Sequence, residues 1–297
     1  MNPERMQIRF KPADYPAGRS ADHLDFPNIM DLLTPEALGI LFAVGLLAGF
    51  VDSIAGGGGL LTIPALLAAG LSPAEALATG KLQSSFGSLS ATIKFVRRGE
   101  VNPASMRTMI LCTFVGAGAG ATLVQMLDPS FLRDVIPILL IGIALYLLLS
   151  PKAGDVDAQQ RIGEHAFALS IGTGIGFYDG FFGPGTGTFF AIAFVSLLGY
   201  NLRKATAHTK VLNLTSNVAS LLFFIVGGHV LWTVGLLMGV GQYIGAQLGA
   251  HMVIRNGARV VRPMLVVASI VITVKLVWSD ENNILREIFA AAVALAA

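Results

Sequence analysis

Two lysines that each follow a glycine cluster are the residues best suited to bind a ligand. Lys81 and Lys210 both lie inside apolar stretches of the sequence. A lysine in a membrane segment costs about 3 kcal/mol or more unless it is paired or faces water. A single such lysine could extend its ammonium group to the membrane surface, but two at equivalent positions favour a shared role. We therefore expect both ammonium groups to line a site that attracts a small anionic substrate.

The residues before each lysine repeat in the same order: an acid, a glycine cluster, a short apolar run and the lysine. The first copy reads GFVDSIAGGGG and later AEALATGK, and the second reads GFYDGFFGPGTGT and later RKATAHTK. Asp52 corresponds to Asp179 in this alignment. We interpret the two copies as the two halves of one substrate site.

The glycine clusters are expected to bind the anion through backbone N–H groups. Glycine lets the backbone approach a ligand closely, and a helix that begins after the cluster directs the positive end of its dipole toward the ligand. Close helix packing is the alternative explanation of a glycine run. No Gly-Lys-Ser/Thr sequence follows at the required spacing, which excludes a P-loop. The predicted substrate-binding glycines are Gly56, Gly57, Gly58, Gly183 and Gly185, and the Thr186 hydroxyl adds a donor.

A stripe of polar residues continues beyond each lysine. Ser84 follows Lys81 by three residues, and Asn213 and Asn217 follow Lys210 on one helix face. Such a stripe either joins helices or lines a path. We assign Ser84, Asn213 and Asn217 to substrate binding.

Asp52, Asp179 and His208 are candidates for a structural or coupling role. Each aspartate could pair with a lysine or cap backbone N–H groups, or it could carry a proton during transport. The structural role is favoured, because a permanent carboxylate would repel an anionic substrate. His208 could relay a proton or act as a neutral donor, and its counterpart Thr79 shows that titration is not required in both halves.

The composition indicates a protein that crosses a membrane many times. Of the 297 residues, 54% are hydrophobic and 13% are charged, whereas soluble domains have about 25% charged residues. A net charge of +2 without a large basic cluster argues against nucleic acid as a partner. The single cysteine, Cys112, excludes an internal disulfide and a cysteine metal site. The five histidines are scattered, so we expect no metal, no cofactor and no enzymatic activity.

The apolar segments fall into two sets of five. They lie at 37–55, 59–71, 77–96, 106–127 and 132–149, and then at 166–182, 187–199, 207–226, 231–253 and 260–279. The last three of each set are long enough to cross a membrane. The first two are short and meet at a glycine cluster, which favours a re-entrant hairpin or a broken helix pair. Two Gly-x-x-x-Gly steps, Gly116–Gly120 and Gly241–Gly245, are typical of close helix packing.

The predicted fold is an all-α polytopic membrane protein with two inverted-topology repeats. Each repeat consists of a glycine-rich re-entrant or broken helix pair and three spanning helices. Basic loops near Arg97, Arg203 and Arg255 each have a non-basic counterpart in the other half, which predicts opposite insertion and periplasmic termini. The predicted parts are a polar N-terminal extension at 1–36, repeat 1 at 37–149, a cytoplasmic linker at 150–164, repeat 2 at 165–279 and a C-terminal tail at 280–297.

The two motifs resemble those of the TauE/SafE family of bacterial membrane permeases, often called sulfite exporters. The likeness extends over residues 37–280 and is strongest to the YfcA-type branch, through GLLAGFVDSIAGGGGLLTIPALLAAGLSPAEALATGKLQ and KATAHTKVLNLTSN. The resemblance implies an inner-membrane protein with inverted repeats. Some family members export sulfite, sulfoacetate or related sulfonates.

These observations predict a secondary transporter, an exporter of a small sulfur-containing oxyanion such as sulfite or an organosulfonate. The anion is expected to bind near the membrane midplane between the two glycine-rich hairpins. The alternatives are a passive anion channel, a transporter of a non-sulfur anion, a membrane-embedded enzyme and a non-transporting scaffold. The expected partners are the small anion, the lipid bilayer and, as a further possibility, a second copy of the chain.

Overall fold

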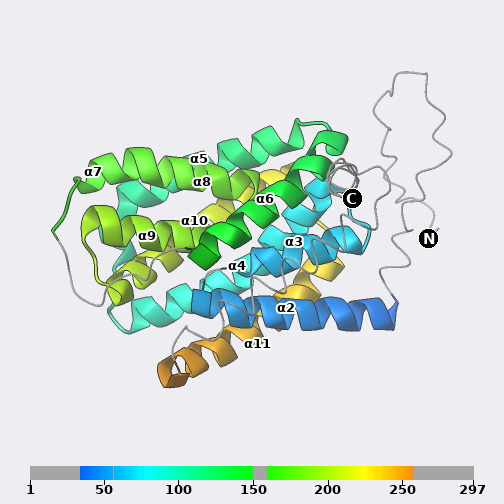
Figure 1. Ribbon diagram of the computed structural model, residues 1–297, viewed down its shortest axis with the longest axis horizontal. Helices are drawn as coiled ribbons and strands as arrows, with labels where there is room; N and C mark the ends of the chain where they lie inside the picture. The colour runs from blue at the N-terminus through cyan, green and yellow to red at the C-terminus, as the bar shows by residue number, and fades with distance from the viewer. Residues whose placement is uncertain (1–33, 56, 150–158, 257–297) are drawn as a thin grey trace, which may run out of the picture.

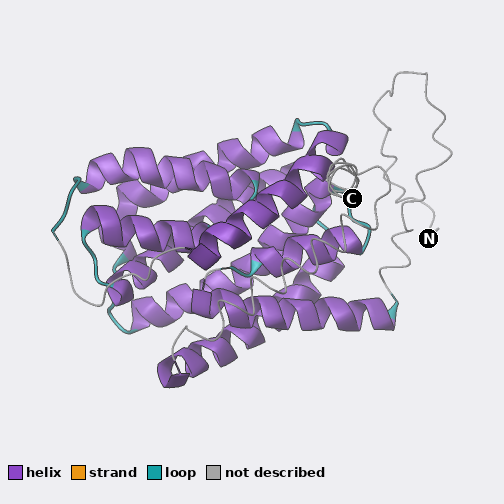
Figure 2. Cartoon of the chain, in the orientation of Figure 1, coloured by secondary structure: helices purple, strands orange, loops and turns teal. Residues whose placement is uncertain are grey.

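The protein is a bundle of helices. A computed structural model describes residues 34–55, 57–149 and 159–256, and these residues contain no strand (Figure 2). The all-α prediction is confirmed for this part of the chain. Several predicted features lie outside the described residues, namely the extension before residue 34, Gly56, most of the linker, the segment at 260–279 and the tail at 280–297.

The described helices follow the predicted apolar segments. The first half contributes α2 (Pro35–Ala55), α3 (Gly59–Ala68), α4 (Pro73–Arg97), the 3-10 turn η1 (Pro103–Met106), α5 (Arg107–Gln125) and α6 (Pro129–Leu149). The second half contributes α7 (Glu164–Phe167), the π-helical turn η2 (Ala168–Gly172), α8 (Thr173–Phe181), α9 (Thr186–Leu198), α10 (Leu202–Val226) and α11 (Trp232–Asn256). Since α7, η2 and α8 follow one another without a break, they act as one long helix with a π-turn inside it.

Helices α4 and α10 begin earlier than their apolar segments, because polar caps start them. The Ser72 hydroxyl accepts a hydrogen bond from the Glu75 N–H at 3.4 Å, and the Glu75 carboxylate accepts one from the Ser72 N–H at 2.9 Å. Asn201 caps α10 with its side-chain oxygen. As a result, Lys81 and Lys210 are each the ninth residue of a 25-residue helix, about 12 Å along its axis. Both lysines lie deeper than the apolar segments alone suggested.

The first helix of the first half is not the short arm that was predicted. Helix α2 has 21 residues, whereas α3 has 10 and α9 has 13. The Thr34 hydroxyl accepts a hydrogen bond from the Ala37 N–H at 3.3 Å, and Pro35 opens the helix at a position where a missing N–H costs nothing. The prediction of two short arms is therefore wrong for α2. Each glycine cluster joins a long helix to a short one.

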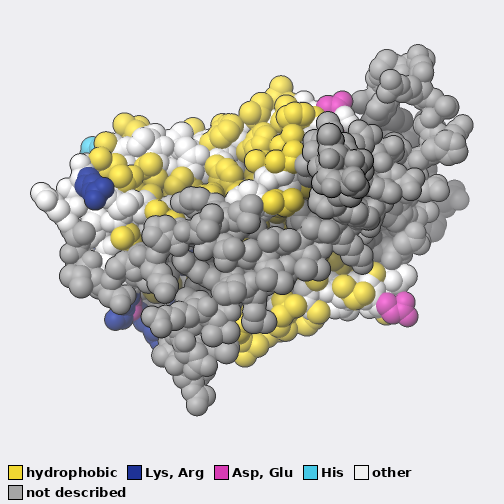
Figure 3. All heavy atoms as spheres, in the orientation of Figure 1, with side chains coloured by type: hydrophobic (Ala, Val, Ile, Leu, Met, Phe, Trp, Pro, Cys, Tyr) yellow, Lys and Arg dark blue, Asp and Glu magenta, His cyan; other side chains and the backbone are white. Residues whose placement is uncertain are grey.

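Several of the helices have the length and apolar surface of membrane spans. Among the described residues, three stretches are both long and apolar enough to cross a membrane: Pro35–Ser53, Pro103–Gln125 and Arg203–Val226. Large apolar side chains such as Leu111 on α5 and Leu248 on α11 point outward, with exposed fractions of 63% and 53%. Hydrophobic atoms cover much of the described outer surface in Figure 3. The protein is a polytopic membrane protein.

Each of the two outer helix pairs combines one helix from each half. Helix α2 of the first half packs against α11 of the second, and α8 of the second packs against α5 of the first. In Figure 1 these two pairs form the lower and upper edges of the bundle, and α3, α4, α9 and α10 lie between them. Neither half is a separate unit, because each supplies one helix to each outer pair.

Glycines make both outer pairs unusually close. A Cβ on Gly49 of α2 would lie 2.1 Å from the Gln242 carbonyl oxygen, and a Cβ on Gly176 of α8 would lie 2.6 Å from that of Thr113. The same closeness, 1.9 to 2.6 Å from a partner carbonyl oxygen, holds at Gly116, Gly120, Gly241 and Gly245. These distances confirm that the two Gly-x-x-x-Gly steps serve close helix packing.

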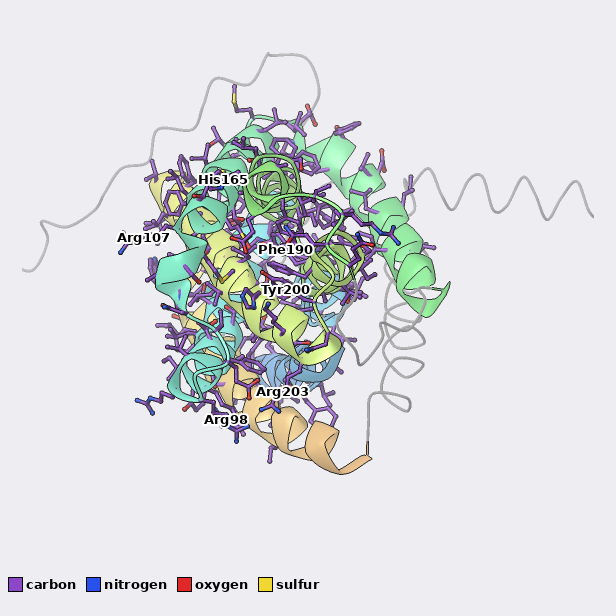
Figure 4. All side chains as sticks on the ribbon, turned by 90° about the vertical axis from the view of Figure 1, so that its left-hand side faces the viewer. Arg98, Arg107, His165, Phe190, Tyr200 and Arg203 are labelled. Carbon is purple, nitrogen blue, oxygen red and sulfur yellow. The ribbon has the colours of Figure 1, made fainter. Side chains whose placement is uncertain are left out.

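The central helices α4 and α10 run antiparallel. Just after α4 ends, Glu100 accepts a hydrogen bond from the Arg203 Nε at 2.7 Å, at the start of α10. At the other end, the Leu231 N–H donates to the Thr79 hydroxyl at 3.2 Å, just after α10 and near the start of α4. The hydrogen bond from Arg203 lowers the pKa of Glu100, so this contact stays ionised at neutral pH. In the end-on view of Figure 4, the labelled residues Arg98 and Arg203 mark this end of the two helices.

A glycine pair on α8 tests the packing. Gly180→Ala would place a Cβ 2.0 Å from the Ala117 carbonyl oxygen, whereas Gly174→Ala meets nothing within 4 Å. We expect Gly180→Ala to lower stability by about 1–3 kcal/mol because α5 and α8 must separate. Gly174→Ala should be neutral or slightly stabilising, since alanine is the better helix former. Thermal unfolding of the purified protein measures both, and equal Tm values for the two variants would contradict the close packing.

Candidate functional site

The first lysine forms a buried ion pair with the acid of the other half. Lys81 Nζ on α4 lies 2.9 Å from Asp179 Oδ1 on α8, and it also donates to the Asp179 backbone carbonyl. The side chains are only 6% and 3% exposed. The Thr186 hydroxyl donates to the same Oδ1 at 2.8 Å. Breaking a pair in this setting would leave an uncompensated charge in an apolar interior.

The second lysine repeats this arrangement in the opposite direction. Lys210 Nζ on α10 lies 3.6 Å from Asp52 Oδ2 on α2 and donates to the Asp52 backbone carbonyl at 3.0 Å. The Asp52 side chain is 14% exposed, so this pair has a longer N–O distance and a more exposed carboxylate than the Lys81–Asp179 pair. Each lysine therefore binds both the carboxylate and the backbone of the acid that precedes the other half's glycine cluster.

These pairs bear on two questions that the sequence left open. Lys81 and Lys210 are 5% and 4% exposed, so neither extends its ammonium group to solvent. Asp52 and Asp179 each pair with a lysine, as the structural role requires, and a proton-carrying role of either acid stays a prediction. The sequence did not reveal that the pairing crosses between the halves.

One polar cavity lies beside the Lys81–Asp179 pair. It has a volume of about 40 Å³ and is bounded by helices from both halves. Nine of the predicted site residues line it: Lys81, Ser84, Gly183, Gly185, Thr186, Asn213, Asn217, Asp52 and Asp179. The tertiary structure thus gathers most of the candidates from both motifs around one space.

Two short helices begin at this cavity. Gly59 and Thr62 from the first turn of α3, and Thr186 and Gly187 from the first turn of α9, are all part of its wall. A helix N-terminus carries roughly half a positive charge. The expectation that each glycine cluster ends in a helix start is confirmed at both positions.

The second glycine cluster has a backbone that requires glycine. Gly183 has φ +102° and Gly185 has φ +85°, in the region that L side chains rarely adopt. A Cβ on Gly183 would also lie 2.8 Å from Lys81 Nζ. Glycine here lets the lysine approach the backbone of the opposite half, which a side chain would prevent.

Some predicted residues lie off the cavity wall. Gly57, Gly58 and Lys210 are buried but are not part of the wall, and Lys210 contacts the wall residue Asp52. His208 lies elsewhere: its ring packs against Tyr200 and Phe194 with centroid distances of 4.9 and 5.6 Å. The His208 Nδ1 lies 2.8 Å from the Lys204 carbonyl oxygen in the same helix. This environment is that of a packed side chain at the helix start.

Two residues of the wall and one buried amide pair were not predicted from the sequence. Gly59 and Thr62 line the cavity but were not assigned to the site, although the helix start after the glycine run pointed to them. Outside the wall, the Gln83 Nε2 on α4 donates to the Gln242 Oε1 on α11 at 2.6 Å. This buried amide pair connects residues far apart in the chain, and no local signal in the sequence indicated it.

Comparison with known proteins identifies relatives along most of the chain. The family profile described as "Sulfite exporter TauE/SafE" matches residues 41–276. The "Probable membrane transporter protein YfcA" of Escherichia coli strain K12 is 54% identical over 256 residues, which cover 86% of this chain and 95% of the relative. No solved structure matches the chain significantly.

More distant relatives carry similar names. A "Probable membrane transporter protein" of Haemophilus influenzae strain Rd is 48% identical over 245 residues, 82% of this chain and 96% of the relative. The "Probable membrane transporter protein YunE" of Bacillus subtilis strain 168 is 27% identical over 236 residues, 71% of this chain and 86% of the relative. The residues matched by the family profile, 41–276, include both glycine-rich motifs and both lysines.

The buried ion pair can be tested by a double-mutant cycle. Lys81→Met or Asp179→Leu alone should lower stability by about 3–5 kcal/mol, because each leaves a buried charge without its partner. The double variant should recover most of that loss, since no charge remains. Thermal unfolding in detergent gives the comparison.

The exposed Arg203–Glu100 pair provides a matched control for this cycle. Arg203 is 76% exposed at its side chain, so Arg203→Met should change the Tm far less than Lys81→Met. If the losses from Lys81→Met and Asp179→Leu simply add in the double variant, the two side chains are not energetically coupled.

Proposed function

The chain belongs to the TauE/SafE sulfite exporter family and is a membrane transporter, and from this premise we propose that it exports a small sulfur-containing oxyanion, such as sulfite or an organosulfonate. It acts as a secondary transporter in the bacterial inner membrane. The anion binds in the cavity between the two glycine-rich segments.

The observation that carries this proposal is the meeting of two helix N-termini and a lysine at one cavity. Lys81 and Asp179 cancel in charge, and so do Lys210 and Asp52. The first turns of α3 and α9 then add roughly half a positive charge each. The site as a whole offers about one positive charge, which favours a ligand with one net negative charge.

The cavity also favours a small ligand. A buried water needs roughly 10–15 Å³ by the same measure, so about 40 Å³ holds about three waters or one compact oxyanion. Hydroxyl and amide groups on the wall, from Ser84, Thr186, Asn213 and Asn217, supply hydrogen-bond donors for its oxygens. Sulfite fits this space better than a long-chain sulfonate.

Alternating access arises from two inverted repeats that rock around this fixed site. The antiparallel α4 and α10 support the inversion, because they are the equivalent third segments of the two halves. The inversion is also supported by the outer pairs, because α2 packs against a helix of the second half and α8 packs against a helix of the first half. A motion of one half against the other moves both lysine–aspartate pairs, since each pair joins the two halves.

The basic end of the molecule faces the cytoplasm in this proposal. Arg98 follows α4 and Arg203 begins α10, and both lie at the end viewed in Figure 4. Basic loops next to spans are retained in the cytoplasm. With this orientation we keep the prediction from the loop charges that the linker after α6 is cytoplasmic and both termini are periplasmic.

Flux in proteoliposomes tests the function. We expect saturable sulfite efflux from vesicles that contain the wild-type protein, and saturation separates a carrier from a passive channel. Sulfonate, thiosulfate and a non-sulfur oxyanion such as nitrate test the substrate class in the same assay. Absence of movement for every sulfur oxyanion under any gradient would reject the proposal.

Removing both lysines tests the site. Lys81→Met together with Lys210→Met removes both cations, so sulfite efflux should fall at least about tenfold, the change that corresponds to 1.4 kcal/mol. Normal efflux in this variant would show that the anion binds elsewhere. Protein that reconstitutes with wild-type yield and orientation is required for the comparison.

His208→Phe provides a control for the histidine. The ring contacts with Tyr200 and Phe194 are retained by phenylalanine, and His208 is not part of the cavity wall. We expect sulfite efflux and its pH profile to match those of the wild type. A changed pH profile would restore His208 as a proton relay.

A further inference from the structure

One carboxylate oxygen of a residue that lines the cavity has no hydrogen-bond partner among the described residues. Asp179 Oδ1 accepts from Lys81 and from the Thr186 hydroxyl, but Oδ2 is buried without a partner among the described residues. The residue is 2% exposed and lines the cavity. A buried carboxylate oxygen in this position is costly unless something donates to it.

An oxyanion cannot satisfy this oxygen by itself. The ligand that the cavity favours carries only acceptor oxygens, and a carboxylate is also an acceptor. Placing the two against each other creates repulsion where a hydrogen bond is needed. A single proton between Oδ2 and the ligand resolves this mismatch, because it converts one of the two acceptors into a donor.

Asp179 is the charged group near the cavity that is best placed to hold this proton. Among the described residues, the charged side chains at or next to the cavity are Lys81, Lys210 and Asp52. Both lysines already bind an aspartate, and Asp52 is more exposed to water than Asp179. The neighbouring Tyr178 hydroxyl donates to the Pro184 carbonyl oxygen, so its proton is already used.

We infer that the anion and one proton bind together, with the proton held between Asp179 Oδ2 and the ligand. This inference rests on the proposed function of the cavity. The proton comes from the solution on the loading side and leaves with the anion on the other side. No bond other than this O–H bond forms or breaks.

The charge balance of the site agrees with this stoichiometry. A doubly charged oxyanion with one proton carries one net negative charge, which matches the roughly one positive charge offered by the two helix N-termini. An interior-negative membrane potential then favours export of the pair. The inference thus names a proton as the second transported species and Asp179 as the group that holds it.

Calorimetry counts the proton directly. The purified full-length protein is titrated with thiosulfate, which stays fully ionised near neutral pH, and with sulfite, in two buffers with different ionisation heats. We expect the wild type to take up about one proton per thiosulfate. The affinity of the wild type for thiosulfate should fall by up to about tenfold for each unit by which the pH rises, because proton uptake is linked to binding.

Asp179→Asn is the informative variant. The Asn side chain keeps an oxygen for Lys81 and Thr186 and places an NH₂ donor where Oδ2 lies, so it imitates the protonated acid. We expect it to bind thiosulfate with an affinity within about threefold of the wild type in mildly acidic buffer, with no proton uptake and no pH dependence. Asp52→Asn, the matched change in the other half, should weaken binding but retain the uptake of about one proton.

The outcomes separate the inference from the proposed function. If the wild type binds either anion without proton uptake, or if Asp179→Asn still takes up a proton, the inference is wrong while the anion site stands. If the wild type binds neither anion, the proposed function fails and the inference fails with it. Should Asp179→Asn not fold, the proton count of the wild type decides alone.

Discussion

Two crossed ion pairs hold the centre of this transporter together. Lys81 of the first half binds Asp179 of the second, and Lys210 of the second binds Asp52 of the first. Each lysine also contacts the backbone carbonyl of its aspartate, just before a glycine cluster. Because each lysine and its acid come from different halves, neither half can stabilise its buried charges without the other. The cavity beside these pairs exists only in the joined molecule.

Close glycine packing makes these contacts possible. At Gly49 and Gly176 the helix backbones approach so closely that a Cβ would meet a carbonyl oxygen. At Gly183 the missing side chain leaves room for the Lys81 ammonium group. The glycines of one motif therefore serve two purposes. Those in the long helices join the halves, and those between helices shape the site and begin the short helices whose positive ends face the cavity.

Much of the fold and of the site could be predicted from the sequence, because both depend on local patterns. Apolar segments gave the order of the described helices, and the repeated motif pointed to Lys81, Asp179, Gly183 and their counterparts. The predicted length of α2 was wrong, since the cap formed by Thr34 and Pro35 extends it. The contacts of His208 with Tyr200 and Phe194 were not predicted from the sequence, because they form only on folding, and its role stays a prediction.

The sequence by itself determined the membrane class of this protein, its helical segments and the residue types of its site, because hydropathy, helix caps and repeated motifs are encoded locally. Only the tertiary structure decided which lysine binds which aspartate. It also decided that Thr62 is part of the cavity wall and that Gly57 and Lys210 are not. These outcomes depend on how two distant helix pairs cross, and the approach of their backbones is set by packing across the whole bundle.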